Sequence, residues 1–111
     1  MLQIIGTKKC KETAKALRAC KERSLVFQFI NLSERKLSDG EWESLFRALS
    51  SEELLDTAST YYQKNGYKFR EFEPQEELKE HPELLKTPIL RNKTKAVAGF
   101  DLPTLVEWGS A

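Results

Sequence analysis

The sequence predicts one domain of the α/β class, spanning residues 1–111 and built around a mixed four-stranded sheet. Three observations predict it. The chain opens with a strand, a helix and a second strand, it closes with two short strands and a helix, and the stretch between these units, about residues 33–86, carries only short helical patterns. A chain of 111 residues can bury one core but is too short for two.

The first unit is a strand–helix–strand. Leu2–Ile5 is a short apolar run typical of a strand, and Val26–Ile30 combines aromatic and β-branched residues without a breaker. The segment Thr13–Glu22 between them is predicted to be helical. Two strands joined through a helix pair in parallel with a right-handed crossover, so we expect that geometry here.

The middle of the chain is predicted to be a helical insertion. Ser38 or Asp39 can cap a helix in which apolar residues recur at helical spacing, namely Trp42, Leu45, Phe46 and Leu49. Further short helices are expected in three places: from Ser50, over 59–65 with a stop at Gly66, and over 74–85 with an interruption at Pro82. The insertion therefore separates the two units that form the sheet.

The last third of the chain returns to strands. Ile89–Arg91 and Ala96–Ala98 are short strands on either side of a polar turn, which is typical of an antiparallel hairpin. Asp101 can cap a final helix that has Pro103 in its first turn. The whole order, β-α-β followed by β-β-α around a helical insertion, is that of a thioredoxin-like (glutaredoxin-like) domain.

Composition excludes several classes of function. Lysine and arginine number 18 and aspartate and glutamate 17, so the chain lacks the concentrated basic surface that direct nucleic-acid binding needs. No apolar run approaches the roughly 20 residues of a membrane span, and the sequence has no recognisable secretory signal, so we expect a cytoplasmic protein. One histidine and two distant cysteines do not match a metal-ligand spacing, so no metal is expected. We interpret His81 as an exposed loop residue rather than a general base.

Cys10 carries the strongest indication of chemistry. It lies at the turn from the first strand to the first helix, where the helix dipole favours an anion, and Lys8, Lys9 and Lys11 add positive charge nearby. Both influences favour the thiolate, which is the reactive form of cysteine. The alternative is a partly exposed thiol without a role, and we favour the nucleophile.

Two other residues bear on Cys10. Cys20 lies further along the predicted helix, about 15 Å away, whereas disulfide-bonded residues have Cα atoms about 5.5 Å apart. We therefore expect Cys20 to be a buried side chain and not a resolving thiol. Thr13 follows Cys10 by about one helical turn. Its hydroxyl either donates a hydrogen bond to the thiolate and lowers the pKa of Cys10, or it only caps the helix or packs, and the sequence leaves both open.

Three segments, taken in order, match one known family. Gly6–Leu17, Leu54–Lys64, and Pro82–Leu90 followed by Ala98–Asp101 resemble the active-site, middle helical and closing segments of the arsenate-reductase-like (ArsC/Spx) family. The chain most resembles the small YffB-type members, which carry one cysteine at this turn. The resemblance covers nearly the whole chain and implies a thioredoxin-like fold with a nucleophilic Cys10.

The resemblance also implies a cis peptide bond between Thr87 and Pro88, with Pro88 beside Cys10. It further shows what this chain lacks. The Spx-type regulators carry a Cys-x-x-Cys at the turn, and here the second position is Thr13. An internal disulfide switch of that kind therefore cannot form.

A second departure concerns oxyanion binding. The arsenate reductases of the family use three arginines to hold the oxyanion. The corresponding positions here are Asp56 (or Ala58 in an Spx-type alignment), Thr87, and a position near Phe100, and none of them is arginine. Because such a dianion needs bidentate guanidinium donors, arsenate reduction is not the leading expectation.

We therefore expect a cytoplasmic thiol oxidoreductase that uses Cys10 as a monothiol nucleophile. An external thiol must resolve its adduct. The resemblance implies glutathione as co-substrate, with glutaredoxin or thioredoxin as other electron donors, and no bound cofactor. Substrate contacts are expected from Lys8, Lys11, Thr13, Thr87 and Pro88. Two alternatives stay open, namely an Spx-like regulatory or interaction module that binds the transcription machinery (RNA polymerase), and an arsenate reductase with an atypical oxyanion site.

Overall fold

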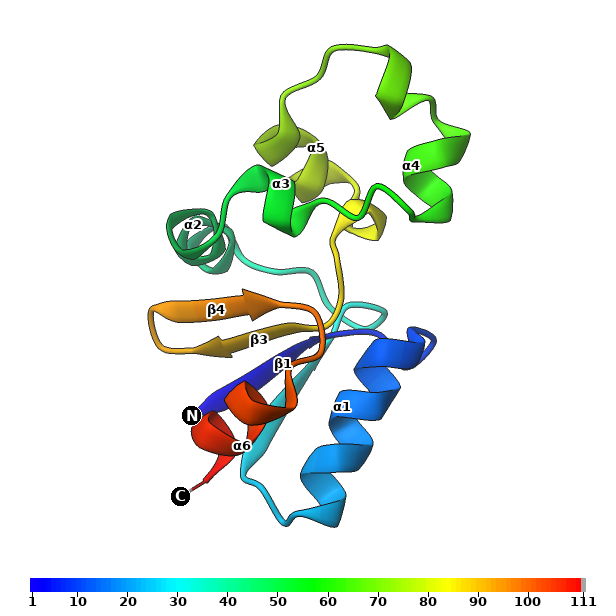
Figure 1. Ribbon diagram of the computed structural model, residues 1–111. Coiled ribbons are helices and arrows are strands. Elements are labelled where there is room, and N and C mark those ends of the chain that lie inside the picture. The colour runs from blue at the N-terminus through cyan, green and yellow to red at the C-terminus, as the bar shows by residue number, and fades with distance from the viewer. Residues whose placement is uncertain (111) are drawn as a thin grey trace.

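The structure, a computed structural model, describes residues 1–110 and contains a four-stranded sheet with the strand order β2-β1-β3-β4 (Figure 1). β1 (Leu2–Gly6) and β2 (Phe27–Asn31) pair in parallel, and α1 (Lys11–Glu22) connects them. The predicted strand–helix–strand unit is confirmed. Its helix begins two residues earlier than predicted, at Lys11.

The C-terminal unit adds two antiparallel strands. β3 (Ile89–Asn92) and β4 (Lys95–Ala98) form the predicted hairpin, and β3 also pairs antiparallel with β1, so the sheet is mixed as predicted. α6 (Leu102–Gly109) completes the fold. Asp101 is the N-cap residue of α6, as predicted, although its carboxylate accepts no backbone N–H and instead accepts a hydrogen bond from Thr104 Oγ1 at 2.7 Å.

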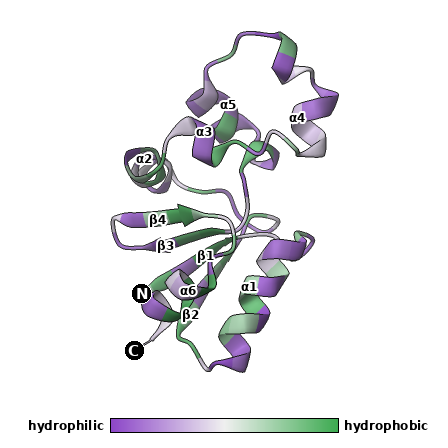
Figure 2. Cartoon of the chain, viewed as in Figure 1, coloured by the Kyte–Doolittle hydropathy of each residue, from purple (hydrophilic) through white to green (hydrophobic). Residues whose placement is uncertain are grey.

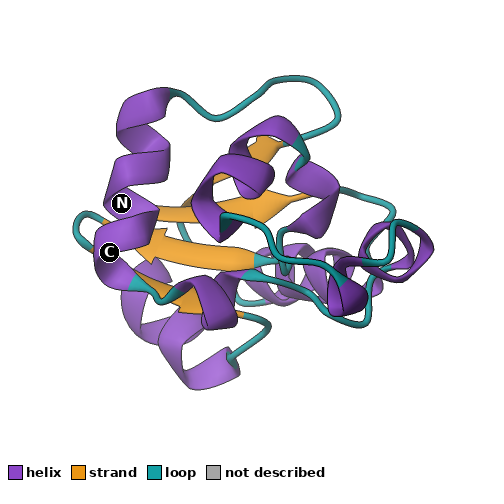
Figure 3. Cartoon of the chain, turned by 90° about the horizontal axis from the view of Figure 1, so that it is seen from above, coloured by secondary structure: helices purple, strands orange, loops and turns teal. Residues whose placement is uncertain are grey.

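The helices cover both faces of the sheet. α1 and α6 lie on one face, below the sheet in Figure 1, and α2 (Asp39–Ala48) lies over the opposite face beside β4. The N-terminus and the end of α6 lie close together in both Figure 1 and Figure 3, at one end of the sheet. The molecule measures 44 × 25 × 24 Å because the rest of the insertion extends beyond the sheet on the α2 side.

The insertion, about residues 33–86, includes no strand of the sheet, and the short helices predicted for it are present. Besides α2 it contains α3 (Ser51–Leu54), α4 (Thr60–Lys64) and α5 (Pro74–Glu80), together with two one-turn 3₁₀ helices, η1 (Tyr67–Phe69) and η2 (Pro82–Leu84). None of the helices within residues 1–110 is long and apolar enough to cross a membrane.

Two serines begin helices of the insertion through reciprocal hydrogen bonds. The Ser38 hydroxyl accepts the N–H of Glu41 at 3.2 Å, and the Glu41 carboxylate accepts the N–H of Ser38 at 2.8 Å. Ser50 and Glu53 repeat this arrangement at α3. Such capping boxes satisfy N–H groups that the first turn of a helix leaves unpaired, so these short helices have well-defined starts.

The end of α3 is tied to the segment that leads back to the sheet. Leu55 and Leu85 form an isolated antiparallel bridge. The N–H of Asp56 donates to the carbonyl of Leu84 at 2.8 Å, and the N–H of Lys86 donates to the carbonyl of Leu54 at 2.7 Å. These hydrogen bonds fix the chain immediately before Thr87, and so the insertion positions the residue that adjoins the candidate site.

The alternation of side chains along β1 divides the core into two clusters. Leu2 and Ile4 face α1 and α6 and pack with Ala16, Ala19, Cys20, Leu90 and Leu105. Ile5 faces the other side, in a larger cluster that the sheet shares with the insertion: Ile30, Leu37, Trp42, Leu45, Leu49, Leu54, Tyr67, Leu78, Leu84, Leu85 and Ile89. In Figure 2 the strands are mostly hydrophobic, whereas the helices carry hydrophilic residues on much of their surface.

Candidate active site

Cys10 lies where the carboxyl end of β1 turns into α1, and it is the N-cap residue of that helix. Its backbone is extended (φ −75°, ψ 122°), its N–H donates to the carbonyl of Thr7 at 3.2 Å, and its carbonyl accepts the N–H of Ala14 at 2.9 Å. Because an N-cap residue adjoins the unpaired N–H groups of the first helical turn, this turn presents backbone donors to the sulfur.

Thr87 and Pro88 lie beside Cys10. The bond between them is cis, as the resemblance implied. The Cys10 thiol donates to the carbonyl of Thr87, with 3.6 Å between sulfur and oxygen. The pairing of β1 with β3 brings these distant segments together, because Ile5 lies opposite Ile89 at the end of the ladder nearest the site.

Thr13 is completely buried beneath this turn. Its hydroxyl has no hydrogen-bond partner within residues 1–110 while Cys10 is a thiol, an arrangement that costs roughly 1–3 kcal/mol. The side chain packs against Gly6, where an added Cβ would overlap the Thr13 hydroxyl and lie 2.9 Å from its Cγ2. Gly6 therefore provides the space that Thr13 occupies, and the hydroxyl proton stays free for the sulfur.

The pKa of Cys10 is lowered by its surroundings. Burial of the sulfur is the largest influence and raises the pKa, but the hydroxyls of Thr13 and Thr87 and the backbone N–H groups of Thr13 and Glu12 together outweigh it by hydrogen bonding to the thiolate. Of the two interpretations left open for Thr13, the lowered pKa of Cys10 and the unpaired Thr13 hydroxyl favour the donor.

The neighbouring lysines do not take part in this stabilisation. Lys8, Lys9 and Lys11 are exposed, and none of them is among the groups that lower the pKa of Cys10. The lowering comes from hydroxyl and amide donors instead. Contact between Lys8 or Lys11 and a substrate stays a prediction.

The residues at the positions where the arsenate reductases carry arginine make other contacts in this chain. Asp56 is held at the Leu55–Leu85 bridge, Thr87 adjoins the sulfur, and the ring of Phe100 lies 5.6 Å from the ammonium of Lys15. A dianion at Cys10 would therefore meet hydroxyl and amide groups rather than bidentate guanidinium donors.

Arg91 is the arginine nearest in sequence to the cis-proline, and its guanidinium is committed elsewhere. It donates to Gln3 Oε1 at 2.7 Å and to Ser44 Oγ at 3.0 Å. Gln3 is near the start of β1, whereas Cys10 follows its end. Arg91 therefore joins the sheet to α2 and does not supply an oxyanion donor to the site.

A cleft of about 520 Å³ opens beside Cys10. Thr7 and Thr87, which both form hydrogen bonds with Cys10, are among the residues that line it. Its walls come from the β2–α2 connection and from the end of α5 with η2: Leu32, Ser33, Lys36, Glu80, Pro82, Glu83 and Leu85. The insertion, which includes most of these residues, thus supplies most of the lining of a cavity next to the candidate nucleophile.

Cys20 differs from Cys10 in every respect that matters for reactivity. It is fully buried in the cluster between the sheet, α1 and α6, and this burial raises the pKa of its thiol. The prediction of a buried, non-resolving side chain agrees with this placement, because Cys20 would have to leave the core to reach Cys10.

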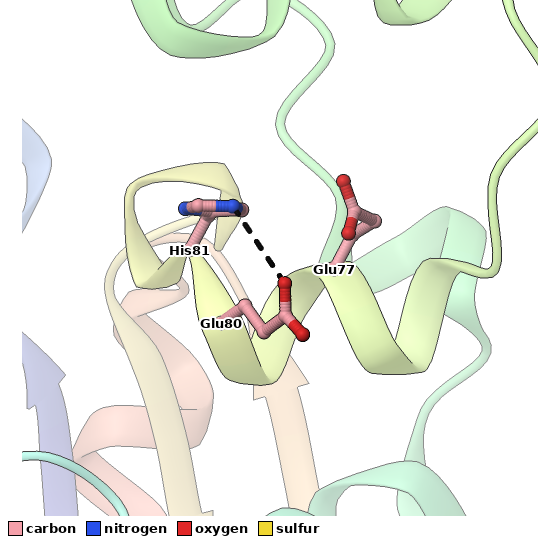
Figure 4. Close-up of side chains that lie close together, drawn as sticks. All are labelled: Glu77, Glu80 and His81. Atoms are coloured by element: carbon pink, nitrogen blue, oxygen red, sulfur yellow. Dashed lines mark ion pairs between the residues drawn. The ribbon is translucent and has the colours of Figure 1, made fainter.

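Glu77, Glu80 and His81 form a group, among the described residues, whose potential ligand atoms all lie within 4.8 Å of one another (Figure 4). Glu77 already pairs with Arg70 at 3.1 Å, and that positive charge opposes a cation. His81 is half-buried against the ring of Tyr61, 5.1 Å between centroids, and not fully exposed as predicted. The group gives no argument for a metal, and the expectation of none stays a prediction.

A mixed four-stranded sheet, a cis-proline and a cysteine at the N-cap of α1 define a thioredoxin-like domain with a single-cysteine site. A profile of the ArsC family matches residues 5–106, which is nearly the whole chain. The chain belongs to the ArsC family.

Solved structures share this fold. A YffB protein matches with a TM-score of 0.85 at 16% identity, covering 99% of this chain and 100% of that chain. A putative arsenate reductase from Yersinia pestis matches with a TM-score of 0.78 at 18% identity (96% and 99% covered), and an arsenate reductase from Vibrio cholerae with 0.76 at 18% (96% and 96%). At these identities the likeness shows the fold alone. No curated protein matches the chain.

Two parts of the site were not found from the sequence. The contact between Gly6 and Thr13 joins a strand to the helix that follows it, and a glycine at the end of a strand was the only signal available. The walls of the cleft come from two segments far apart in the sequence. Exposed charged residues such as Lys36 and Glu83 have no local pattern that distinguishes them from ordinary surface residues.

Proposed function

We propose that the chain is a cytoplasmic thiol oxidoreductase that uses Cys10 as its only nucleophile. One observation supports the proposal: Cys10 is the N-cap of α1 beside the cis-proline, its sulfur lies 3.6 Å from the Thr87 carbonyl oxygen, and hydroxyl and amide donors around it lower its pKa despite burial. A thiolate held in this way is the form that attacks disulfides.

In the proposed reaction the Cys10 thiolate attacks a mixed disulfide between a substrate and glutathione. A bond forms between Cys10 and the glutathione sulfur, the original S–S bond breaks, and the substrate leaves as a thiolate that takes a proton from water. A second glutathione thiolate then attacks the adduct, releases glutathione disulfide and restores the Cys10 thiolate. The substrate is reduced and two glutathione thiols are joined in the product.

The second thiol has to come from outside the protein because Cys20 is buried in the opposite part of α1. Glutathione is the small thiol proposed for this step, and glutaredoxin or thioredoxin are alternative reductants. Lys8 or Lys11, both exposed near the sulfur, would attract a carboxylate of glutathione. Thr87 and Pro88 would flank the disulfide.

Arsenate is a less suitable substrate for this site. Two structural neighbours are described as arsenate reductases, but the three positions discussed above offer no guanidinium to an oxyanion. An Spx-like module bound to RNA polymerase would not require the lowered pKa of Cys10. One experiment distinguishes arsenate reduction and RNA polymerase binding from disulfide reduction.

The test is reduction of a mixed disulfide by glutathione, coupled to glutathione reductase. We expect turnover with the native chain, none with Cys10→Ser, and near-native turnover with Cys20→Ala as the matched control. Turnover that persists in Cys10→Ser contradicts the proposal. Turnover with arsenate but not with disulfides would support the oxyanion alternative, and a Cys10-independent complex with RNA polymerase in an inert protein would support the regulatory one.

A further inference from the structure

The cleft lies next to Cys10 through two of its lining residues. Thr7 and Thr87 both line it, and each also forms a hydrogen bond with Cys10. Its volume of about 520 Å³ lies within the range of roughly 300–1,000 Å³ typical of small-molecule sites. A group bonded to Cys10 through sulfur therefore has a cavity of suitable size next to it.

The floor of the cleft is apolar. Leu85 is 4% exposed, and Leu32 and Pro82 are half-buried around the same space. Apolar walls exclude water and strengthen the electrostatic interactions made at their edges. The cleft can thus cover the aliphatic part of a bound molecule while charged groups lie at its rim.

The rim carries charges of both signs that do not pair with each other. Lys36, on the β2–α2 connection, and Glu83, in η2, both line the cleft. Neither forms an ion pair with any residue in 1–110, and Glu80 pairs only with its neighbour His81, at 3.9 Å. An ammonium and two carboxylates that line one cavity and form no ion pair with one another within residues 1–110 match a ligand that carries both charges.

We propose that this cleft is a subsite for an α-amino-acid group, a zwitterion, on the disulfide that Cys10 attacks. The ligand's carboxylate faces Lys36 and its ammonium faces Glu83, with Glu80 adding to the negative side. The subsite rests on the proposed function, since it acts on the substrate of Cys10, and it adds the chemical class of that substrate. A substrate that carries only negative charge is disfavoured, because the two carboxylates of Glu80 and Glu83 repel it and only the ammonium of Lys36 attracts it.

The experiment uses four symmetrical disulfides that differ in charge: cystine (two zwitterions), cystamine (dication), dithiodipropionate (dianion) and bis(hydroxyethyl) disulfide (neutral). Formation of the Cys10 adduct is followed by mass spectrometry in the Cys20→Ala chain. Each rate is divided by the rate of the same disulfide with free 2-mercaptoethanol, which removes differences in intrinsic reactivity. Cystine is expected to have the highest normalised rate.

Two variants test whether the preference for cystine comes from the charges that line the cleft. Lys36→Met and Glu83→Gln are each expected to lower the normalised rate of cystine about two- to fivefold, the size of one exposed charge interaction, while leaving the neutral disulfide unchanged. Lys36→Met should affect dithiodipropionate more than cystamine, and Glu83→Gln the reverse. The matched controls Lys21→Met and Glu76→Gln alter exposed charges that do not line the cleft, and should change no rate.

The outcomes separate the two proposals. If the neutral disulfide reacts with Cys10 faster than with the free thiol but the four normalised rates are equal, or the cleft variants behave like the controls, the subsite is overturned and the proposed function stands. If no disulfide reacts faster with Cys10 than with the free thiol, the proposed function is overturned, and the subsite with it.

Discussion

The two ends of α1 place the chain's two cysteines in opposite environments. Cys10 is the N-cap, partly exposed, with hydroxyl and amide donors that lower its pKa. Cys20 lies in the same helix, fully buried, and its pKa is raised by that burial alone. Burial raises the pKa of both thiols, so burial does not explain why the two shifts have opposite signs. The hydrogen-bond donors around Cys10, from the start of α1 and from Thr87, explain it.

The contrast also shows what the fold supplies at each position. At Cys20 the neighbours are apolar side chains that exclude water and offer nothing to an anion. At Cys10 the donors come from three parts of the chain: the first turn of α1, the Thr13 hydroxyl beneath it, and Thr87 before the cis-proline. The thiolate is therefore stabilised by a tertiary arrangement and not by the helix start alone.

The largest expected difference between Cys10 and Cys20 is in their rates of alkylation. Iodoacetamide should modify Cys10 at least about a hundredfold faster than Cys20 in the native chain, because a buried thiol reacts only after opening, which costs several kcal/mol. Peptide mapping after timed quenching measures both rates. In denaturant the two rates should become similar, and comparable rates in the folded chain would break the contrast.

A substitution at Gly6 should disturb the Cys10 end through Thr13. Gly6→Ala places a Cβ against the Thr13 side chain and is expected to lower the free energy of unfolding by about 1–3 kcal/mol. Denaturant unfolding measures it. Adding Thr13→Ala should recover part of the loss, since the two side chains compete for one space. A stable Gly6→Ala chain, or no recovery in the double variant, would contradict the packing described.

Thr13→Val should separate stability from reactivity. The valine keeps the shape but removes a buried hydroxyl without a partner, so at a pH where Cys10 is a thiol we expect the free energy of unfolding to rise by about 1 kcal/mol. The same change removes a donor to the thiolate, so the pKa of Cys10 should rise. Chemical denaturation and a thiolate titration measure the two effects. A lower stability with an unchanged pKa would mean that Thr13 only packs.

The smallest expected effect is on the pH dependence of stability. Cys10 has a lowered pKa, so its contribution is present above the unfolded value of about 8.5 and is lost as pH falls through the folded pKa. Cys20 has a raised pKa, so its contribution is present below about 8.5 and is lost as pH rises through the folded pKa.

Unfolding free energies measured across the neutral to alkaline range test these opposite signs. Relative to the native chain, Cys10→Ser should flatten the part of the curve that rises with pH, and Cys20→Ala should reduce the fall at higher pH. Parallel curves for the two variants would show that the two thiols titrate alike in the folded state.

The sequence predicted the order of the elements because their signals are local. Apolar spacing around Trp42, the serine starts at Ser38 and Ser50, and the interruption at Pro82 all reappear in the structure. Asp101 is the N-cap residue of α6 as predicted, but its carboxylate accepts a hydrogen bond from the Thr104 hydroxyl and none from a backbone N–H. Which donor a capping side chain bonds depends on side-chain geometry, which a cap preference does not contain.

The site was predicted less completely than the fold. Cys10 was found because its turn position is visible in the sequence, but the early start of α1 at Lys11 was missed, since Lys11 and Glu12 carry no apolar pattern. The charge of the neighbouring lysines was given too much weight as a cause of the lowered pKa of Cys10, and the hydroxyls of Thr13 and Thr87 were given too little. Whether a donor reaches the sulfur depends on how Thr13 packs against Gly6, and that contact exists only in the folded chain.

The most direct test of this account is the pKa of Cys10, measured by ultraviolet thiolate absorbance against pH in the Cys20→Ala chain. The arrangement of donors predicts a value clearly below the ordinary cysteine value of about 8.5, and a rise toward it in Thr13→Val. A value at or above the ordinary one would mean that burial outweighs the donors, and Cys10 would then not be the nucleophile described here.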